Sequence, residues 1–439
     1  MLEEGIRIDE SPKRALWSSE RAFILSAAAA AVGLGNLWRF PYMAGENGGA
    51  AFILAYIIAV IVVGIPLMVL EFALGRQSRG NTVGMFRYLS QSVSWFGWLV
   101  VGLTTIIISY YLVITGWTLG YAAASFSGNL LPFQEFTESY NSLWYFLITA
   151  LVTGWIVAKG VSGIERFARW MMPALVVVVV GLAGYGLTLP GRGEAIDFLF
   201  SPDFELLREP RLWLFAVGQA FYSLAVGSGY LITYGSSLGP GVPIGRSSVV
   251  IAAVETTMAL LAGFMVFPIV FTFGLAPDAG SELAFNTLPV AFAEMGIGFL
   301  IAPVFFVMFF AAALSSCVGG VKVIAASIQE ELSVPYRKAV YWTTAILVLL
   351  GTPSALSFTR MRLSIAGRPF LEIMDMFAAT QILVTAGLVT GTMIAWLIPR
   401  GRLISHLGVK SRKVGHFIIT VGRYLPALVL LVLLYTWLA

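Results

Sequence analysis

Several ionisable side chains lie within otherwise apolar stretches of the sequence. They are Arg39, Glu71, Glu255, Lys322 and Asp375. A charge at the depth of the lipid chains is costly unless an opposite charge, hydrogen bonds or a bound ion stabilises it, so such residues are candidates for functional sites. They could form ion pairs that open and close, coordinate a cation, or take up a proton.

Two glycine clusters interrupt apolar runs. Gly33, Gly35 and Asn36 lie in the first run, and Gly227 and Gly229 lie in the sixth. Either cluster alone is weak evidence, because glycine is common in membrane helices. A break at membrane depth leaves amides and carbonyls bare, which is tolerable only around a polar cavity. The two runs occupy equivalent places in two halves of five helices each, which is the pattern of an inverted-repeat transporter with broken helices.

The composition indicates the elements that must hold these residues. Of 439 residues, 58% are hydrophobic and 11% are charged, against about 25% charged in soluble proteins. A spanning helix needs roughly 20 mostly apolar residues, and the sequence supplies about eleven such runs. We therefore expect an all-α polytopic membrane protein with spans near 20–42, 50–74, 95–125, 143–159, 168–188, 212–237, 247–275, 297–329, 338–355, 371–398 and 417–437.

The cationic loops predict the orientation of these spans. Lys and Arg cluster after the second, fourth and tenth runs, and loops of this kind stay in the cytoplasm. The start of the chain has no apolar core, so it is expected to be a cytoplasmic tail rather than a signal peptide. With an odd number of spans, the C-terminus lies outside the cell. The expected divisions are 1–19 for the tail, 20–190 for spans one to five, 191–400 for spans six to ten, and 401–439 for a cytoplasmic loop and the last span.

Segments covering nearly the whole chain resemble the neurotransmitter:sodium symporter family. They include AVGLGNLWRFP (31–41), ENGGAAF (46–52), GIPLMVLEFALGR (64–76), GQAFYSLAVGSG (218–229) and ALSSCVGG (313–320). Within the family, the sequence is similar to eleven-helix amino acid transporters of bacteria and archaea. The resemblance implies the leucine-transporter fold, a 5+5 inverted repeat plus one additional helix, and Na+-coupled uptake of an amino acid or amine.

The resemblance implies a first Na+ site formed by Ala31, Asn36, Ser223 and Glu255 together with the substrate carboxylate. Hard cations prefer oxygen ligands, which an unwound backbone supplies. Glu255 departs from the neutral Asn of some members. A cation should neutralise it, or it should take up a proton. The alternative is a structural carboxylate that is hydrogen-bonded to neighbouring helices.

A second Na+ site is implied where carbonyls of the first and eighth spans meet two adjacent hydroxyls. The matching residues are Ala29, Val32, Ala312, Ser315 and Ser316. Adjacent serines in a membrane helix more often bond back to carbonyls of their own helix, which is the alternative interpretation. Two Na+ ions are therefore expected.

The resemblance also implies a substrate pocket between the two breaks. The amides of Leu34 and Gly35 and the hydroxyl of Tyr111 would bind the carboxylate of the substrate, although Tyr111 could instead be a packing residue. Gly320 and Ser228 replace bulkier residues of a leucine-selective member, so we expect a larger, hydrophobic or aromatic L-amino acid. The full set of expected substrate contacts is Ala31, Leu34, Gly35, Ile107, Tyr111, Tyr222, Ser223, Ala225, Ser228, Ser316, Cys317 and Gly320.

Two gates are expected around this pocket. Arg39 with Asp375 resembles the outer pair, and Arg14 with Glu330, assisted by Trp17, resembles the inner pair. Pairs that form in only one state can close the path alternately. For Arg14 and Glu330, solvated interfacial charges are an equally good interpretation of the sequence.

Lys322 is a candidate for a role in ion coupling. It follows Ser315 by seven residues, which is about two helical turns, so it lies on the same face and points toward the transport path. One explanation is a structural salt bridge to Glu71. The other is an amine that titrates or takes the place of a cation and so changes ion coupling.

The predicted function is import of a hydrophobic or aromatic L-amino acid with Na+ by alternating access. The alternatives are proton-coupled or sodium-independent transport or exchange, involving Lys322 and Glu255, and an amino acid sensor that does not translocate. Chloride should be dispensable, because Ala259 stands where chloride-dependent relatives have a hydroxyl. Enzyme motifs are absent, so catalysis is not expected. The expected partners are the amino acid and the lipid bilayer of the plasma membrane, with no nucleic acid, for a protein that is a monomer or weak dimer.

Overall fold

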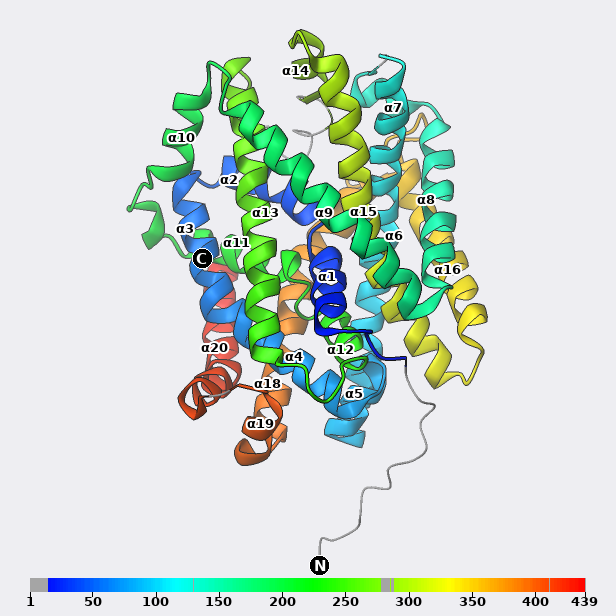
Figure 1. The fold of residues 1–439 in the computed structure, drawn as a ribbon, viewed down its shortest axis with the longest axis vertical. Helices are drawn as coiled ribbons and strands as arrows, with labels where there is room; N and C mark the ends of the chain where they lie inside the picture. Colours follow the sequence, from blue (N-terminus) through cyan, green and yellow to red (C-terminus); the bar gives the residue numbers. More distant parts are fainter. Residues whose placement is uncertain (1–14, 129, 278–284, 286–287, 410, 439) are drawn as a thin grey trace, which may run out of the picture.

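The computed structural model describes residues 15–128, 130–277, 285, 288–409 and 411–438. The described part is a bundle of helices with one two-stranded hairpin (Figure 1). The helices of the first half are α1 (Glu20–Ala31), η1 (Gly35–Arg39), α2 (Phe40–Glu46), α3 (Ala50–Ala59), η2 (Val60–Gly64), α4 (Ile65–Ser78), α5 (Thr82–Leu89), η3 (Gln91–Val93), α6 (Ser94–Phe126), α7 (Phe133–Glu138), α8 (Asn141–Val157) and α9 (Gly160–Gly186).

The second half repeats this mixture of long and interrupted helices. The antiparallel hairpin pairs β1 with β2 between α16 and α17. The elements are α10 (Arg192–Phe200), η4 (Leu206–Arg208), α11 (Pro210–Ser223), α12 (Tyr230–Gly235), α13 (Ile244–Thr272), α14 (Leu288–Glu294), α15 (Gly298–Glu331), α16 (Tyr336–Leu356), β1 (Ser364–Ile365), β2 (Arg368–Pro369), α17 (Phe370–Met374), η7 (Asp375–Ile382), α18 (Leu383–Leu397), α19 (Arg400–His406) and α20 (Arg412–Leu438).

Each predicted apolar run corresponds to a helix or to an interrupted helix pair. Within the described residues, seven helices are long and apolar enough to span a membrane, and α1 with η1–α2 forms one further span bent by 47°. The fifth run begins earlier than predicted, at Gly160 instead of 168, because its polar first turns, including Glu165 and Arg166, continue the helix beyond the apolar segment. The short helices α10 and α14 lie between the predicted spans, α10 between the fifth and sixth and α14 between the seventh and eighth. The expected division into two repeats at residue 190 stays a prediction.

The interrupted helices lie at the centre of the bundle. In Figure 1, α1 lies between α13, α9 and α15, while α5 and α19 lie at the end of the bundle where the chain begins and α7 and α14 lie at the opposite end. The residues 27–31 at the end of α1 are all buried. Alanine at each of these positions lets the neighbouring helices approach α1 closely. The centre of the molecule therefore holds the two points at which helices stop.

Gly227, in the second break, has a backbone conformation that only glycine adopts readily. Its φ is +80°, and a Cβ atom there would lie 2.4 Å from Cα of Gly387. We expect G227A to destabilise the protein by about 2–4 kcal/mol, because left-handed strain and overpacking add. Gly128 has φ +68°, and among the described residues other than its chain neighbours no atom lies within 4 Å of an added Cβ, so G128A should cost only the strain, about 1–2 kcal/mol. Heat denaturation of the purified variants in detergent measures this difference, and equal midpoints would contradict it.

Candidate substrate and ion site

The first break separates α1 from the π-helical turn η1. Val32 is extended, with φ −78° and ψ 101°, and so ends the helix. Side chains accept the amide hydrogens that the helix no longer bonds. Oδ1 of Asn36 accepts from the amide of Gly33 at 3.2 Å, and the hydroxyl of Tyr111 accepts from the amide of Leu34 at 2.9 Å. Tyr111 therefore stabilises the break directly and is more than a packing residue.

The second break, 224–229, joins α11 to α12. The amide of Gly227 donates to Oε1 of Glu71 at 2.9 Å. The hydroxyl of Thr104 donates to the carbonyl of Ser228 at 2.7 Å. Both partners come from long helices of the first half, α4 and α6. A carboxylate and a hydroxyl from two other helices therefore hold the break. Backbone groups at the depth of the lipid chains need such partners, because the lipid offers no hydrogen bonds.

Asn36, Ser223 and Glu255, three of the four residues predicted for the first Na+ site, lie together with Tyr56 where η1, α3, α11 and α13 meet. Nδ2 of Asn36 donates to the carboxylate of Glu255 at 2.7 Å and to its backbone carbonyl at 3.0 Å. The hydroxyl of Tyr56 donates to the same carboxylate at 2.9 and 3.1 Å and lies 3.2 Å from Oγ of Ser223. Thr256 adds a hydroxyl at 3.2 Å. This buried cluster of oxygens around one carboxylate suits a hard cation, and it also satisfies the hydrogen bonding of Glu255.

The second predicted site is built around one hydroxyl. Oγ of Ser315 donates toward the carbonyls of Ala29 at 2.5 Å, Ala312 at 2.6 Å and Val32 at 3.4 Å. The bond to Ala312 lies within α15, as expected for a membrane serine. The other two carbonyls belong to the end of α1. Four oxygens from two helices therefore converge on one point, and this donor set fits Na+.

Ser316 does not join that group. Its hydroxyl donates to the carbonyl of Ala30 at 3.1 Å, while its side chain lines the central cavity. The two adjacent serines thus point to different carbonyls of α1. In this structure Ser316 lies at the substrate cavity rather than among the oxygens around Ser315.

A buried cavity of about 50 Å³ lies between the two breaks. Its walls combine aliphatic side chains and glycine with three tyrosines and two serines. The predicted substrate contacts that line it are Ala31, Gly35, Ile107, Tyr111, Tyr222, Ala225, Ser228 and Ser316. Ala30 also lines it, and Ile108, Tyr230 and Leu383, which the sequence did not single out, complete it.

Gly320 does not enlarge the cavity in the way expected from its size. An added Cβ at Gly320 would meet the side chain of Ile108 and the hydroxyl of Tyr230, so these two residues occupy the space that a larger residue would take. Cys317 is also not at the cavity wall in the described structure, because its sulfur lies 3.4 Å from Oγ1 of Thr115. Leu34 likewise contributes its amide to Tyr111 rather than a side chain to the wall.

Arg39 and Asp375 lie on the side of the central cavity that faces α7. The guanidinium of Arg39 donates to Gln219 at 2.8 Å and lies 4.8 Å from the centre of the Tyr222 ring. In the described part of the chain, the side chain of Asp375 bonds to the hydroxyl of Tyr110, at 2.9 Å, rather than to Arg39. The predicted direct ion pair is therefore not formed in this structure. A second cavity, of about 250 Å³, opens beyond Asp375.

Trp17 closes the opposite side of the path by joining α1 to α12. Its indole N–H donates to the carbonyl of Tyr234 at 2.9 Å, and its own amide donates to the carbonyl of Ser237 at 3.0 Å. The two rings lie 5.1 Å apart. Beyond Trp17, a cavity of about 840 Å³ leads toward the end of the bundle where the chain begins. The other predicted inner residue, Arg14, lies outside the described residues.

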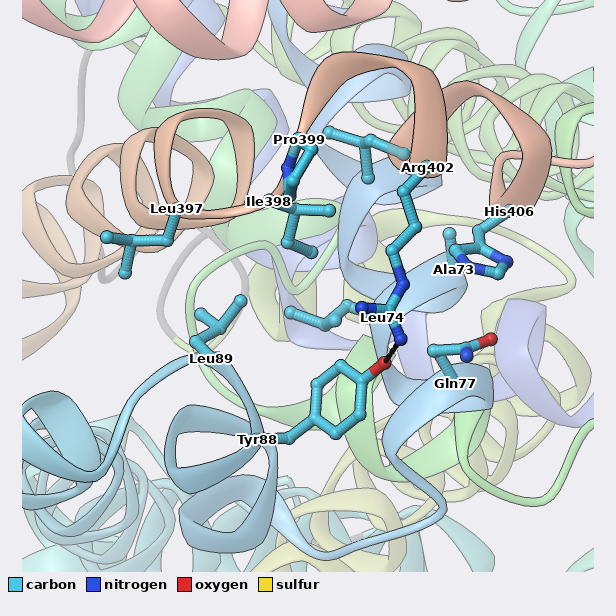
Figure 2. Close-up of a pocket in the computed structure, with 11 residues that line it drawn as sticks. Ala73, Leu74, Gln77, Tyr88, Leu89, Leu397, Ile398, Pro399, Arg402 and His406 are labelled. Atoms are coloured by element: carbon cyan, nitrogen blue, oxygen red, sulfur yellow. Dashed lines mark hydrogen bonds between the residues drawn. The ribbon is translucent and has the colours of Figure 1, made fainter. Parts of the chain in front are cut away.

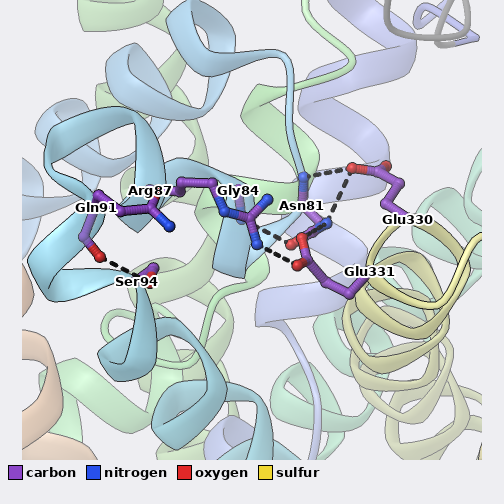
Figure 3. A network of polar contacts seen from close by, with 7 residues as sticks. All are labelled: Asn81, Gly84, Arg87, Gln91, Ser94, Glu330 and Glu331. Atoms are coloured by element: carbon purple, nitrogen blue, oxygen red, sulfur yellow. Dashed lines mark hydrogen bonds and ion pairs between the residues drawn. The ribbon is translucent and has the colours of Figure 1, made fainter.

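Glu330 takes part in a polar network at the rim of this inner cavity. Figure 3 shows Asn81 donating its backbone and side-chain N–H groups to Glu330, at 2.9 and 3.0 Å. The side chain of Asn81 also donates to Glu331, which forms an ion pair with Arg87. Asn81 caps α5 through the amide of Gly84 at 2.9 Å. The network therefore ties the C-terminal end of α15 to the start of α5.

The predicted salt bridge between Lys322 and Glu71 is not formed. Within the described residues, Glu71 accepts its hydrogen bond from Gly227. Nζ of Lys322 instead lies over two rings, 4.3 Å from the centre of Trp17 and 4.6 Å from that of Tyr234. It also lines the inner cavity. The lysine thus contacts the residues that close the inner side of the path, as a cation against aromatic faces.

Glu71 gives a test of how the second break is held. E71A should destabilise the protein by about 1–3 kcal/mol, because the amide of Gly227 loses its partner away from water. E71Q keeps an acceptor oxygen of similar shape and should recover most of that loss. Heat denaturation in detergent compares the two variants. If E71A and E71Q unfold at the wild-type midpoint, the carboxylate does not hold the break.

Comparison with known proteins agrees with this geometry. The model of the sodium:neurotransmitter symporter family matches residues 14–145 and 142–439. An uncharacterized sodium-dependent transporter of Bacillus subtilis is 35% identical over 89% of this chain and 90% of its own, and one of Haemophilus influenzae is 34% identical over 84% and 86%. The crystal structure of MhsT in complex with L-phenylalanine superposes with a TM-score of 0.90 at 35% identity, covering 96% of this chain and 99% of that one. The chain therefore belongs to the sodium:neurotransmitter symporter family, as a membrane transporter with the leucine-transporter fold.

Proposed function

We propose that this transporter imports a hydrophobic or aromatic L-amino acid together with two Na+ ions by alternating access. The observation that carries the proposal is the position of the Ser315 hydroxyl, which two carbonyls of α1 and one of α15 surround. A break in a membrane helix that gathers oxygens beside a cavity has a clear use in binding an alkali cation. The apolar wall of the central cavity supports the substrate class.

The two cations differ in their relation to the substrate. The first would bind among Ala31, Asn36, Ser223 and Glu255, where the substrate carboxylate could complete its shell. The second would bind around Ser315, away from the cavity wall. Both groups use the end of α1, so each bound ion favours the arrangement of α1 that the other requires. That shared element would couple ion binding to amino acid binding.

The carboxylate of Glu255 makes a chloride ion unnecessary in this proposal. Glu255 is fully buried and accepts from Asn36, Tyr56 and Thr256, so a fixed negative charge lies beside the cation. Ala259, one turn further along α13, is buried and offers no hydroxyl to an anion. A site without a carboxylate would need a mobile anion to balance the charge of Na+, whereas in this site the Glu255 carboxylate supplies the negative charge.

The charge distribution supports an orientation with the N-terminus and the α5 and α19 end of the bundle in the cytoplasm. Arg79, Arg87, Arg400 and Arg402 lie at or beside these elements, and positive residues in short loops favour that side. In this orientation Trp17 closes the cytoplasmic side of the path and Arg39 the outer side. Release would require Trp17 to leave the carbonyl of Tyr234.

Transport into proteoliposomes tests the proposal. We expect labelled phenylalanine or a similar amino acid to accumulate with an inward Na+ gradient, and not with choline in its place. Replacing chloride by gluconate should leave the rate unchanged. A proton-coupled transporter would instead accumulate the amino acid with a pH gradient alone, and a sensor would bind it without accumulation. Either result would contradict the proposal.

The variant S315A sharpens that experiment. It removes one ligand of the second cation and should raise the Na+ concentration for half-maximal uptake about tenfold or more, since a bond to a charged group is worth about 1.5–3 kcal/mol. Ser327 is the matched control, because it is also buried on α15 but bonds only to the carbonyl of Val323 in its own helix, at 3.0 Å. S327A should keep the wild-type Na+ dependence.

The position of Lys322 favours a gating role over replacement of a cation. Its ammonium group lies against the rings of Trp17 and Tyr234, and these residues join α1 to α12 on the inner side. A cation over an aromatic face contributes about 0.5–2 kcal/mol. Lys322 would therefore stabilise the inner closure while the cation sites keep their own ligands.

The variant K322Q distinguishes these two roles. Weaker inner closure should change the uptake rate by about 2- to 30-fold, which corresponds to the energy of the lost contact, with Na+ still required and the pH profile unaltered. K322R keeps a cation over the rings and should lie closer to wild type. Uptake by K322Q with an altered Na+ requirement or pH profile would show that the amine takes part in coupling.

A further inference from the structure

A pocket that the transport path does not use lies on the end of the bundle that carries α5 and α19. It has a volume of about 100 Å³ and is formed by the ends of α4 and α18 together with α5 and α19. Figure 2 shows the side chain of Arg402 reaching from α19 across this pocket toward Tyr88 of α5. The pocket therefore lies between α19 and the first half of the bundle.

The polar side of the pocket carries only neutral or basic groups. Gln77, Tyr88, Arg402 and His406 supply its polar atoms, and none of the residues that line it is acidic. Nη2 of Arg402 lies 3.3 Å from the hydroxyl of Tyr88, which uses one of five guanidinium N–H donors. The remaining donors are available to an anion, and arginine binds phosphate oxygens in pairs.

The surroundings of the pocket are also positive. Arg76 donates to two backbone carbonyls, of Val242 at 2.9 Å and of His406 at 3.0 Å, so its charge is held next to the pocket without a carboxylate. Burial, together with Arg402 and Arg76, lowers the pKa of the His406 imidazole. From Arg400 to the end, the sequence contains Arg and Lys but no Asp or Glu. An anion would be drawn to this corner of the molecule.

The other side of the pocket is apolar and continues onto the lipid-facing surface. Leu74, Leu89 and Leu397 line it, and the side chain of Leu397 is 46% exposed. Next to it, Trp396 is 52% exposed and lies under the guanidinium of Arg423, at 4.9 Å. An exposed tryptophan beside an arginine is typical of the boundary between lipid chains and head groups. An anion held here would have acyl chains beside it.

We propose that this pocket binds the phosphate of an anionic phospholipid from the adjacent leaflet, with Arg402 as its main contact and the leucines packing against an acyl chain. Basic pockets between membrane helices on the cytoplasmic side bind head groups of this kind. The bound lipid would fix α19 against α4 and α5. This lipid site would be separate from the substrate cavity and from the cation sites.

The test uses the purified full-length protein and native mass spectrometry in detergent with added phosphatidylglycerol or phosphatidylcholine. Wild type should retain phosphatidylglycerol preferentially. R402Q should weaken that binding at least about tenfold, as expected for loss of a charged hydrogen-bonding partner. The matched control R400Q removes the same charge from an exposed position on the same helix, outside the pocket, and should change binding less than about twofold.

Further measurements distinguish the phosphate of a lipid from free phosphate, and a second variant is available if R402Q does not fold. Inorganic phosphate should not displace the lipid, because it lacks the acyl chains; full displacement would identify a site for a soluble anion and overturn the proposal. Equal retention of phosphatidylcholine, or equal losses in R402Q and R400Q, would overturn it too. H406Q changes a side chain of the pocket lining but leaves the backbone carbonyl that holds Arg76 in place. It should weaken phosphatidylglycerol binding more than R400Q does, so it tests the pocket if R402Q does not fold, and equal binding by H406Q and R400Q would then contradict the proposal.

Discussion

The structure depends on satisfying peptide groups that two membrane helices leave bare at the depth of the lipid chains. Water cannot reach such groups from the bilayer, and each one left unbonded costs several kcal/mol. The chain solves this with side chains from uninterrupted helices. Tyr111 of α6 bonds to the first break, and Glu71 of α4 and Thr104 of α6 bond to the second. These bonds give the backbone groups of both breaks partners from uninterrupted helices.

The same breaks bring oxygens and hydroxyls to the centre of the bundle. Ser315 meets the end of α1, and Asn36 meets Glu255 of α13. Between these contacts lies the central cavity, with Tyr222 and Arg39 on one side and Trp17 further along on the other. The continuous segment from Trp17 through α1 to Asn36 contributes to both groups of oxygens and to the contact with Tyr234, so a change in its position affects all three at once. In the proposed function, this shared segment would couple ions, substrate and gate.

Much of the fold could be predicted from sequence because its signals are long or local. Each apolar run became a helix, and the glycines at 33, 35, 227 and 229 marked the two breaks. The oxygens around Ser315 were also predictable, since the flanking segments carry a family pattern. Predictions of individual pairings were weaker. Lys322 contacts Trp17 and Tyr234 instead of Glu71, because a cation near aromatic rings leaves no regular spacing in the sequence.

The site residues that the sequence did not reveal also leave no regular spacing in the sequence. Tyr56, which bonds to Glu255, and Gln219, which links Arg39 to the carbonyl of Gly35, are single polar residues in apolar helices. Their only sequence signal was that polarity, and nothing in the spacing named their partners. The expectation that Gly320 leaves space in the cavity differs from the structure for another reason. The small size of this residue suggested space, but Ile108 and the hydroxyl of Tyr230 from other helices fill it. Cavity volume depends on residues far apart in sequence, so no local pattern could give it.

The most direct measurement of ion and substrate coupling at the two breaks is equilibrium binding of radioactive 22Na+ to the purified protein, with and without the amino acid. Linked sites require the amino acid to raise Na+ affinity by the same factor as Na+ raises amino acid affinity. Equal reciprocal factors well above one are the predicted result. Na+ binding that is absent, or that does not respond to the amino acid, would contradict the assignment of the two broken helices as a shared ion and substrate site.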